Sequence, residues 1–154
     1  MYYYCFGVTY LNKKTDELVS EIKNTNDIGE YIRENTREFN EDMFLRTLKG
    51  HYVKSGLTQE AIANRALLSH GYVNNVLSGV RKPSRDAVIK LAFGLSLSVD
   101  DANRLLKLAG HGELYPRIER DAIFLFCLNK GTSMIDACIL LQKRLGESLD
   151  ANEK

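Results

Sequence analysis

The chain has 154 residues, of which 44% are hydrophobic and 27% are charged, with a net charge of +1. This composition is typical of a globular protein with a buried core, which excludes a disordered or fibrous chain. The longest apolar run, residues 122–128, is too short for a membrane span, and MYYYCFGVTY lacks the pattern of a secretion signal. Cys5, Cys127 and Cys138 form no CxxC pair, so we expect reduced thiols in a cytoplasmic protein.

Positive charge is concentrated in one part of the chain. Residues 1–48 hold 6 Lys/Arg and 9 Asp/Glu, a balance of −3, and residues 91–154 hold 8 and 9, a balance of −1. Residues 49–90 hold 7 and 2, a balance of +5. Such a local excess is the electrostatic footprint that a nucleic-acid binder needs, although five charges in one segment also arise by chance.

Residues 1–39 are predicted to form an N-terminal extension with an aromatic leader and two short helices. Residues 2–11 are aromatic and β-branched, as in a short strand. No matching run follows, so three roles stay open: a strand shared with a second copy, irregular aromatic cover, or a disordered leader. Thr15 is expected to cap a helix to about Thr25, and Asp27-x-x-Glu30 resembles the capping box of the next. Their apolar faces are expected to hold Leu18, Val19 and Ile22, and Ile28, Tyr31 and Ile32.

Residues 40–97 are predicted to form a helical domain whose helices are delimited by caps. Asn40 is expected to cap a helix that ends near Gly56. Three further helices are expected to begin at the N-caps Thr58, Ser69 and Ser84.

Residues 98–154 are predicted to form a C-terminal helical extension packed on that domain. Ser98 is expected to cap a helix closed by Gly110, and Pro116 to begin the next. That second helix is apolar almost all round from Ala122, so it should be central or lie in an interface. A last helix runs from Thr132 to about Leu145, with inward positions expected at Ile135, Cys138, Ile139 and Leu141.

Residues 57–79 are predicted to form two short helices joined by a turn at residues 67–69. A small core between them is expected from Leu57, Ile62, Ala63, Ala66, Val73 and Val76. The other face of the second helix then carries short, mostly uncharged groups: His70, Gly71, Asn74, Asn75 and Ser78. Asn is suited to bidentate contact with adenine in the major groove, and Gly71 allows close approach at a cost of about 1 kcal/mol relative to Ala. Arg81 and Lys82 follow, placed to neutralise phosphates. A solvated helix face with an ordinary basic turn is the alternative interpretation.

The stretch GLTQEAIANRALLSHGYVNNVLSGVRKPS, residues 56–84, resembles the helix-turn-helix of the phage-repressor (Xre/Cro/cI-like) family of bacterial transcription regulators. The resemblance covers roughly residues 41–97. It implies an all-α fold, a five-helix lambda-repressor-like domain with extra N-terminal and C-terminal helices. It also implies that a recognition helix, residues 69–77, enters the major groove of double-stranded operator DNA. Base readout is then assigned to His70, Gly71, Asn74 and Asn75, and backbone contact to Gln59, Ser69, Tyr72, Ser78, Arg81, Lys82 and Arg85.

The sequence departs from this family pattern in two places. The turn position usually held by Gly is Leu67, so the turn either avoids a positive φ or carries about 1–2 kcal/mol of strain. The family commonly pairs an Arg in the first helix with a Glu in the recognition helix, and these positions are Tyr52 and Leu77 here. Replacing both partners of a buried ion pair by apolar groups is tolerated, so we predict contact between Tyr52 and Leu77.

Residues 104–131, which include LYPR and RDAI, resemble a C-terminal extension of Xre-like regulators from Gram-positive bacteria. "SRDAV" at 84–88 echoes "ERDAI" at 119–123, but one shared triplet does not establish a repeat. Arg117, Arg120 and Asp121 are expected to form an ion-pair network between helices, or to bind an anion or a partner. Local pairing is the favoured interpretation, because arginines at helix starts are usually paired nearby.

The sequence offers little support for catalysis. The three histidines are scattered, and GHGE at 110–113 fits a solvated loop better than a metal or acid-base site, since no HxxxH, CxxC or HExxH accompanies it. We therefore expect no enzyme, cofactor or metal, but a homodimeric regulator that reads two half-sites. The alternative is a protein-interaction adaptor or antitoxin-like module that grips a protein partner through its N- or C-terminal helices.

Overall fold

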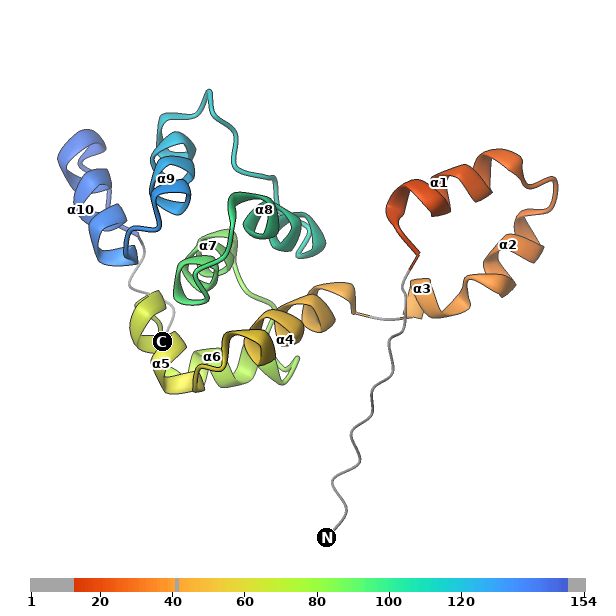
Figure 1. Ribbon diagram of the computed structural model, residues 1–154, viewed down its shortest axis with the longest axis horizontal. Helices are drawn as coiled ribbons and strands as arrows, with labels where there is room; N and C mark the ends of the chain where they lie inside the picture. Colours follow the sequence, from red (N-terminus) through yellow and green to blue (C-terminus); the bar gives the residue numbers. More distant parts are fainter. Residues whose placement is uncertain (1–12, 41, 150–154) are drawn as a thin grey trace, which may run out of the picture. The chain divides into compact units, whose positions relative to one another are not determined.

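The computed structural model describes residues 13–40 and 42–149, except for the side chains of Arg37 and Asn40. Within these residues the fold is all-α, with ten helices and no strand, which confirms the predicted fold class (Figure 1). The possible strand at residues 2–11 and the predicted thiol of Cys5 lie outside the described residues. The chain divides into two compact units, one up to residue 41 and one from Asp42, and each is described by itself. None of the described helices has the length and apolar character needed to cross a membrane.

The first unit contains three short helices, α1 (Thr15–Asn24), α2 (Ile28–Glu34) and α3 (Thr36–Asn40). Asp27 caps α2 as predicted, since its Oδ1 accepts hydrogen bonds from the backbone N–H groups of Gly29 (2.8 Å) and Glu30 (3.3 Å). The backbone N–H of Asp27 donates to Thr25 Oγ1 at 3.2 Å, so Thr25 takes the place predicted for the Glu30 side chain. Thr15 is the first residue of α1 and Lys14 its N-cap, so the predicted cap is one residue off.

The apolar faces predicted for the first unit are largely exposed. Tyr31 is buried, whereas Val19, Ile22, Ile28 and Ile32 are not. Helices α1 and α2 have only ten and seven residues, so each covers little of the other's surface. An apolar stripe is buried only where another element packs along it. The prediction of an inward face therefore holds at Tyr31 and fails at those four positions.

The second unit contains the remaining seven helices. Its elements in chain order are α4 (Met43–Ser55), α5 (Gln59–Ala66), α6 (His70–Leu77), α7 (Arg85–Gly94), α8 (Val99–Leu108), α9 (Glu119–Lys130) and α10 (Met134–Leu145). Four predicted N-caps are confirmed, each accepting a backbone N–H three residues ahead: Thr58, Ser69, Ser84 and Ser98. Asn40 does not cap α4, because it lies in α3; Asp42 caps α4 and accepts from Leu45 N at 3.0 Å.

Helix α7 lies at the centre of the second unit and is buried from Ala87 to Gly94. It packs against α5, α8 and α10. The crossing with α5 depends on Gly94, where an added Cβ would lie 2.9 Å from Ala66 Cβ and from the carbonyl oxygen of Ile62. One apolar cluster extends from α4, α5 and α6 through α7 and α8 to α9 and α10. The C-terminal helices are thus part of the same core as the predicted domain.

The two C-terminal helices differ from prediction in start and orientation. Helix α9 begins at Glu119, after Ile118, and Pro116 lies in the turn before it. Its inward face includes Phe124, whose ring meets that of Phe93 edge-on at 6.2 Å, whereas Phe126 is exposed. Helix α9 is therefore central on one face only.

Helix α10 is rotated relative to the prediction. It begins at Met134, after its N-cap Ser133, and buries Met134, Ala137 and Leu141. Ile135 and Ile139 are exposed, which corrects their predicted inward position. Both sets follow helical spacing, so the packing against α9 and α7 decides which one is buried.

Candidate nucleic-acid interface

The turn between α5 and α6 is a left-handed one at a non-glycine residue. Leu67 has φ 56° and ψ 42°, and Leu68, which is buried, donates its N–H to Ala63 O at 2.9 Å. Of the two possibilities that the sequence left open, the turn adopts the positive φ, which costs about 1–2 kcal/mol in a residue with a Cβ. Ser69 then caps α6, with its Oγ accepting from Tyr72 N at 3.1 Å.

Helix α6 has one buried face and one exposed face. Val73, Val76 and Leu77 are buried in the core, together with Tyr72. The residues predicted for the opposite face are all exposed: His70, Gly71, Asn74, Asn75 and Ser78. We call these five residues the polar ridge. A Cβ added at Gly71 would meet nothing within 4 Å, so the fold itself does not require glycine there.

The segment that follows α6 brings two cations beside the polar ridge. We call residues 79–84 (GVRKPS) the basic loop. Gly79 has φ 79°, and a Cβ there would lie 2.9 Å from Leu45 Cδ2, so glycine is needed both for conformation and for space. Arg81 N donates to Asn75 O at 3.0 Å, which folds the loop back on α6. The side chains of Arg81 and Lys82 are exposed.

Tyr72 occupies a different place from the one predicted. Its side chain is only 3% exposed, and the guanidinium carbon of Arg81 lies 4.6 Å from its ring centroid. A cation over an aromatic face is held there by the quadrupole of the ring. Tyr72 therefore supports Arg81 from beneath, and too little of its surface reaches solvent for the backbone contact that the family resemblance implies.

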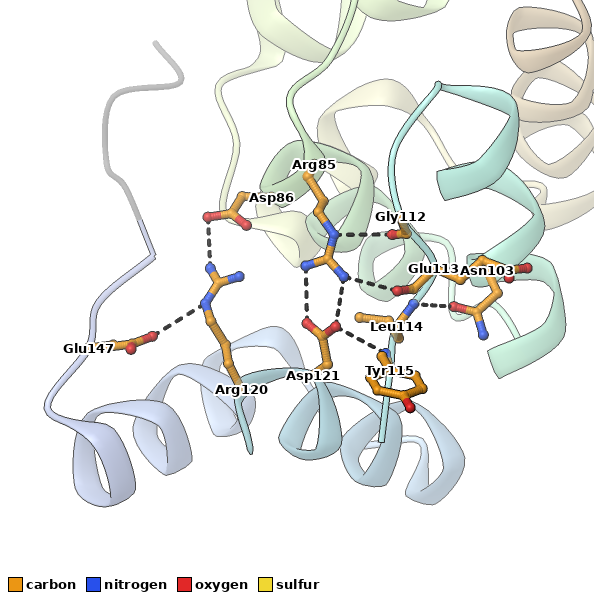
Figure 2. Close-up of polar contacts among 10 residues, drawn as sticks. All are labelled: Arg85, Asp86, Asn103, Gly112, Glu113, Leu114, Tyr115, Arg120, Asp121 and Glu147. Atoms are coloured by element: carbon orange, nitrogen blue, oxygen red, sulfur yellow. Dashed lines mark hydrogen bonds and ion pairs between the residues drawn. The ribbon is translucent and has the colours of Figure 1, made fainter. Parts of the chain in front are cut away.

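The side chain of Arg85 is also occupied by hydrogen bonds within the protein. Its Nη1 and Nη2 donate to the two carboxylate oxygens of Asp121 at 3.0 and 2.8 Å, as Figure 2 shows. Its Nε donates to Gly112 O at 3.1 Å, and Nη2 also to Glu113 O at 3.3 Å. A guanidinium with these partners has few directions left for a phosphate. We therefore remove Arg85 from the set predicted to contact the DNA backbone.

Gln59 and Ser69 take intermediate positions. Gln59 is the first residue of α5 and is half-buried, while Ser69 is exposed and uses its hydroxyl oxygen as the cap of α6. Tyr52 packs against the same apolar cluster that includes Leu77. Direct contact between Tyr52 and Leu77 stays a prediction.

Two reciprocal ion pairs join the similar stretches at residues 84–88 and 119–123. Arg85 of the first binds Asp121 of the second, and Arg120 of the second binds Asp86 of the first at 2.8 Å (Figure 2). Arg120 also lies 3.4 Å from Glu147. The predicted ion-pair network is thus confirmed for Arg120 and Asp121. The echo between residues 84–88 and 119–123 predicted no pairing, because spacing alone does not show that the two helix starts meet.

His111 is a contact that the sequence interpretation missed. Its Nε2 lies 3.0 Å from the carbonyl oxygen of Pro83, in the basic loop. A carbonyl oxygen only accepts, so Nε2 carries the hydrogen in this contact. The neighbouring residues Gly112 and Glu113 hold Arg85, so the GHGE segment is attached to the protein rather than solvated along its whole length. Among the described residues, 13–40 and 42–149, no three His, Cys, Asp or Glu side chains lie close enough together to hold a metal ion.

Part of the second unit matches a known protein family. The family model described as "Helix-turn-helix domain" matches residues 43–105, which run from the start of α4 into α8. The match therefore covers four whole helices and most of α8, and it extends past residue 97, where the sequence had placed the end of the domain. No curated protein and no solved structure matches the chain. The second unit thus contains a helix-turn-helix domain, and a domain of this kind suggests DNA binding.

Proposed function

We propose that this protein is a sequence-specific regulator of transcription that binds double-stranded DNA, and that it belongs with the Xre-like regulators. Helix α6 lies in the major groove, and α5 crosses the backbone with Gln59 near a phosphate. The role is one of recognition and not of catalysis, and it places the protein with the DNA in the cytoplasm.

The observation that carries this proposal is the polar ridge. A helix that exposes only short, mostly uncharged side chains can approach base edges without steric obstruction, and amide groups distinguish adenine from the other bases there. His70, Gly71, Asn74 and Asn75 are exposed together while the opposite face of the same helix is buried. The absence of a Cβ at Gly71, where space is open, fits close approach to a second molecule.

The basic loop supplies the contacts that fix position on the duplex. Arg81 and Lys82 are exposed beside the ridge, and Ser78 ends it with a hydroxyl that donates to Asn75 O at 3.1 Å. Contacts to phosphate orient a protein on DNA but carry no sequence information. The proposed interface is therefore divided into a reading part, α6, and a positioning part, which is the basic loop with Gln59, Ser69 and Ser78.

The test is selection of bound duplexes from a random library, followed by binding measurements on variants. Asn75→Ala is expected to lose discrimination worth about 1–3 kcal/mol at one base pair while non-specific affinity is retained. Lys82→Ala is expected to weaken all sequences alike and to reduce the salt slope by about 1. Asn129→Ala, the same change at an exposed position of α9, which is not assigned to the interface, serves as the matched control and should bind as the parent does. Unchanged discrimination in Asn75→Ala contradicts the assignment of Asn75 to base readout.

The functional unit is proposed to be a homodimer on two half-sites, because one short helix with two adjacent cations reads too few base pairs for tight binding. A second candidate function is a protein-interaction adaptor or antitoxin-like module. It is favoured by the exposed apolar side chains of Phe126, Ile135 and Ile139 on α9 and α10. Salt separates the two functions: affinity for DNA falls steeply between low and physiological salt, whereas an apolar protein contact persists.

A further inference from the structure

We propose that the GHGE segment and Asp121, both outside the matched helix-turn-helix domain, position the basic loop for phosphate contact. This inference rests on the proposed function. It assigns His111 and Asp121 as positioning residues of the DNA-binding surface, although neither belongs to the exposed surface of α6 or of the loop. The C-terminal extension then contributes to DNA binding as well as to the hydrophobic core.

The basic loop is anchored at both of its ends. At its first end Gly79 packs against Leu45 and Arg81 N donates to Asn75 O. At its second end Pro83 is buried and its carbonyl oxygen accepts from His111 Nε2 at 3.0 Å. Between the two anchors Val80, Arg81 and Lys82 are exposed. The cations therefore stand on a short span whose ends are both fixed.

The second anchor is reinforced one residue beyond the loop. Arg85, the first residue of α7, is held by the carbonyl oxygens of Gly112 and Glu113 and by the carboxylate of Asp121 (Figure 2). The carboxylate is itself fixed, since it accepts from Tyr115 N at 3.0 Å and is 2% exposed. Three consecutive residues of the GHGE segment thus hold positions 83 and 85, on either side of the α7 cap Ser84.

The segment that provides these anchors is attached to the domain. Leu114, which is buried, donates its N–H to Asn103 Oδ1 of α8 at 2.9 Å. The GHGE segment is therefore fixed to α8 by Leu114 as well as to the loop by His111. A loop that is ordered before it binds loses less conformational entropy on the duplex, and this is the physical advantage of the anchoring.

The experiment compares His111→Ala and Asp121→Asn with the parent on two probes. These are a duplex recovered from the library selection and a shuffled duplex of the same length and composition. Both variants are expected to bind each probe roughly three- to tenfold more weakly, with the ratio between the probes unchanged, because the loop orients and does not read. Hydrogen exchange of the Arg81 amide, which donates to Asn75 O, is expected to accelerate in the free protein.

Two further variants separate positioning from general damage. Arg120→Gln breaks the adjacent ion pair with Asp86 on the same two helices but leaves the anchors of Pro83 and Arg85 in place, so it should keep the affinity of the parent. His111→Gln retains an N–H donor and should recover most of the affinity lost in His111→Ala. Thermal denaturation confirms that each variant is folded, and His111→Ala, at a half-buried position, tests the proposal even if Asp121→Asn does not fold.

The outcomes are distinguishable. If the parent binds both probes and His111→Ala binds them equally well, the positioning role is wrong and the proposed function stands. Faster exchange of the Arg81 amide with unchanged affinity leads to the same conclusion, since the loop would then be held by His111 but not used on DNA. If Arg120→Gln weakens binding as much as His111→Ala does, the effect is general and the proposal is overturned. If the parent binds no duplex, both proposals fail.

Discussion

Removing the guanidinium of Arg85 tests how much its ion pair with Asp121, which joins α7 to α9, contributes to stability. Arg85→Met keeps an unbranched side chain but leaves the Asp121 carboxylate, 2% exposed, with Tyr115 N as its remaining partner among those described above. Loss of one member of a fully buried pair costs about 3–5 kcal/mol, and loss of an exposed pair about 0–1 kcal/mol. Because the Arg85 side chain is 29% exposed and water screens part of the charge, we expect about 2–4 kcal/mol. Urea denaturation measures this loss directly, and the melting temperature should fall by roughly 10 °C.

Two further variants decide whether burial of the carboxylate is the cause. Arg120→Met breaks the sister pair, whose side chains are 24% and 25% exposed, so Asp86 stays in contact with water and the loss should be about 1 kcal/mol. Arg85→Met combined with Asp121→Leu removes both charges and should recover at least half of the stability lost. A loss in Arg85→Met no larger than in Arg120→Met, or a double variant less stable than Arg85→Met, would refute the reasoning.

Three other predictions test local features of the second unit. Leu67→Gly should be about 1 kcal/mol more stable in urea than Leu67→Ala, reversing the usual order, because only glycine adopts a positive φ without strain; equal stability would contradict the strained turn. Gly94→Ala should cost about 1–3 kcal/mol, since its Cβ meets backbone and side chain at 2.9 Å, whereas Gly71→Ala, in open space, should not destabilise. Burial raises the pKa of the Cys138 thiol above its usual range, so iodoacetamide should label it more slowly than a free cysteine, with the rate rising only at higher pH; peptide mass mapping identifies the labelled site, and labelling at the free rate would count against that burial.

Local chemistry explains why much of the helix-turn-helix domain was predictable. Thr58, Ser69, Ser84 and Ser98 each satisfy N–H groups that a helix start leaves unpaired, and such caps depend on residues within four positions. The two faces of α6 follow from helical period alone, because its apolar residues and its short polar residues do not overlap. These features need no knowledge of the rest of the fold.

Two of the predictions that failed concern contacts between distant elements. The sequence of α10 offers two apolar faces that share Leu141, and only the packing of α9 and α7 selects Met134 and Ala137 over Ile135 and Ile139. Arg85 looks like a phosphate ligand when only its neighbours Arg81 and Lys82 are considered. Its actual partner, Asp121, is 36 positions away, and no periodicity within one helix reports on such a pairing.

The helix-turn-helix match ends at residue 105, but residues beyond it belong to the same hydrophobic core. Phe124, Cys127, Met134 and Leu141 fill the same interior as α7, and Asp121 neutralises a cation at the start of that helix. A fragment cut after the matched residues would expose the aromatic ring of Phe93 to water and leave the Arg85 charge without its counter-ion. A fragment made to study the helix-turn-helix domain by itself therefore needs the chain up to about residue 145, where α10 ends.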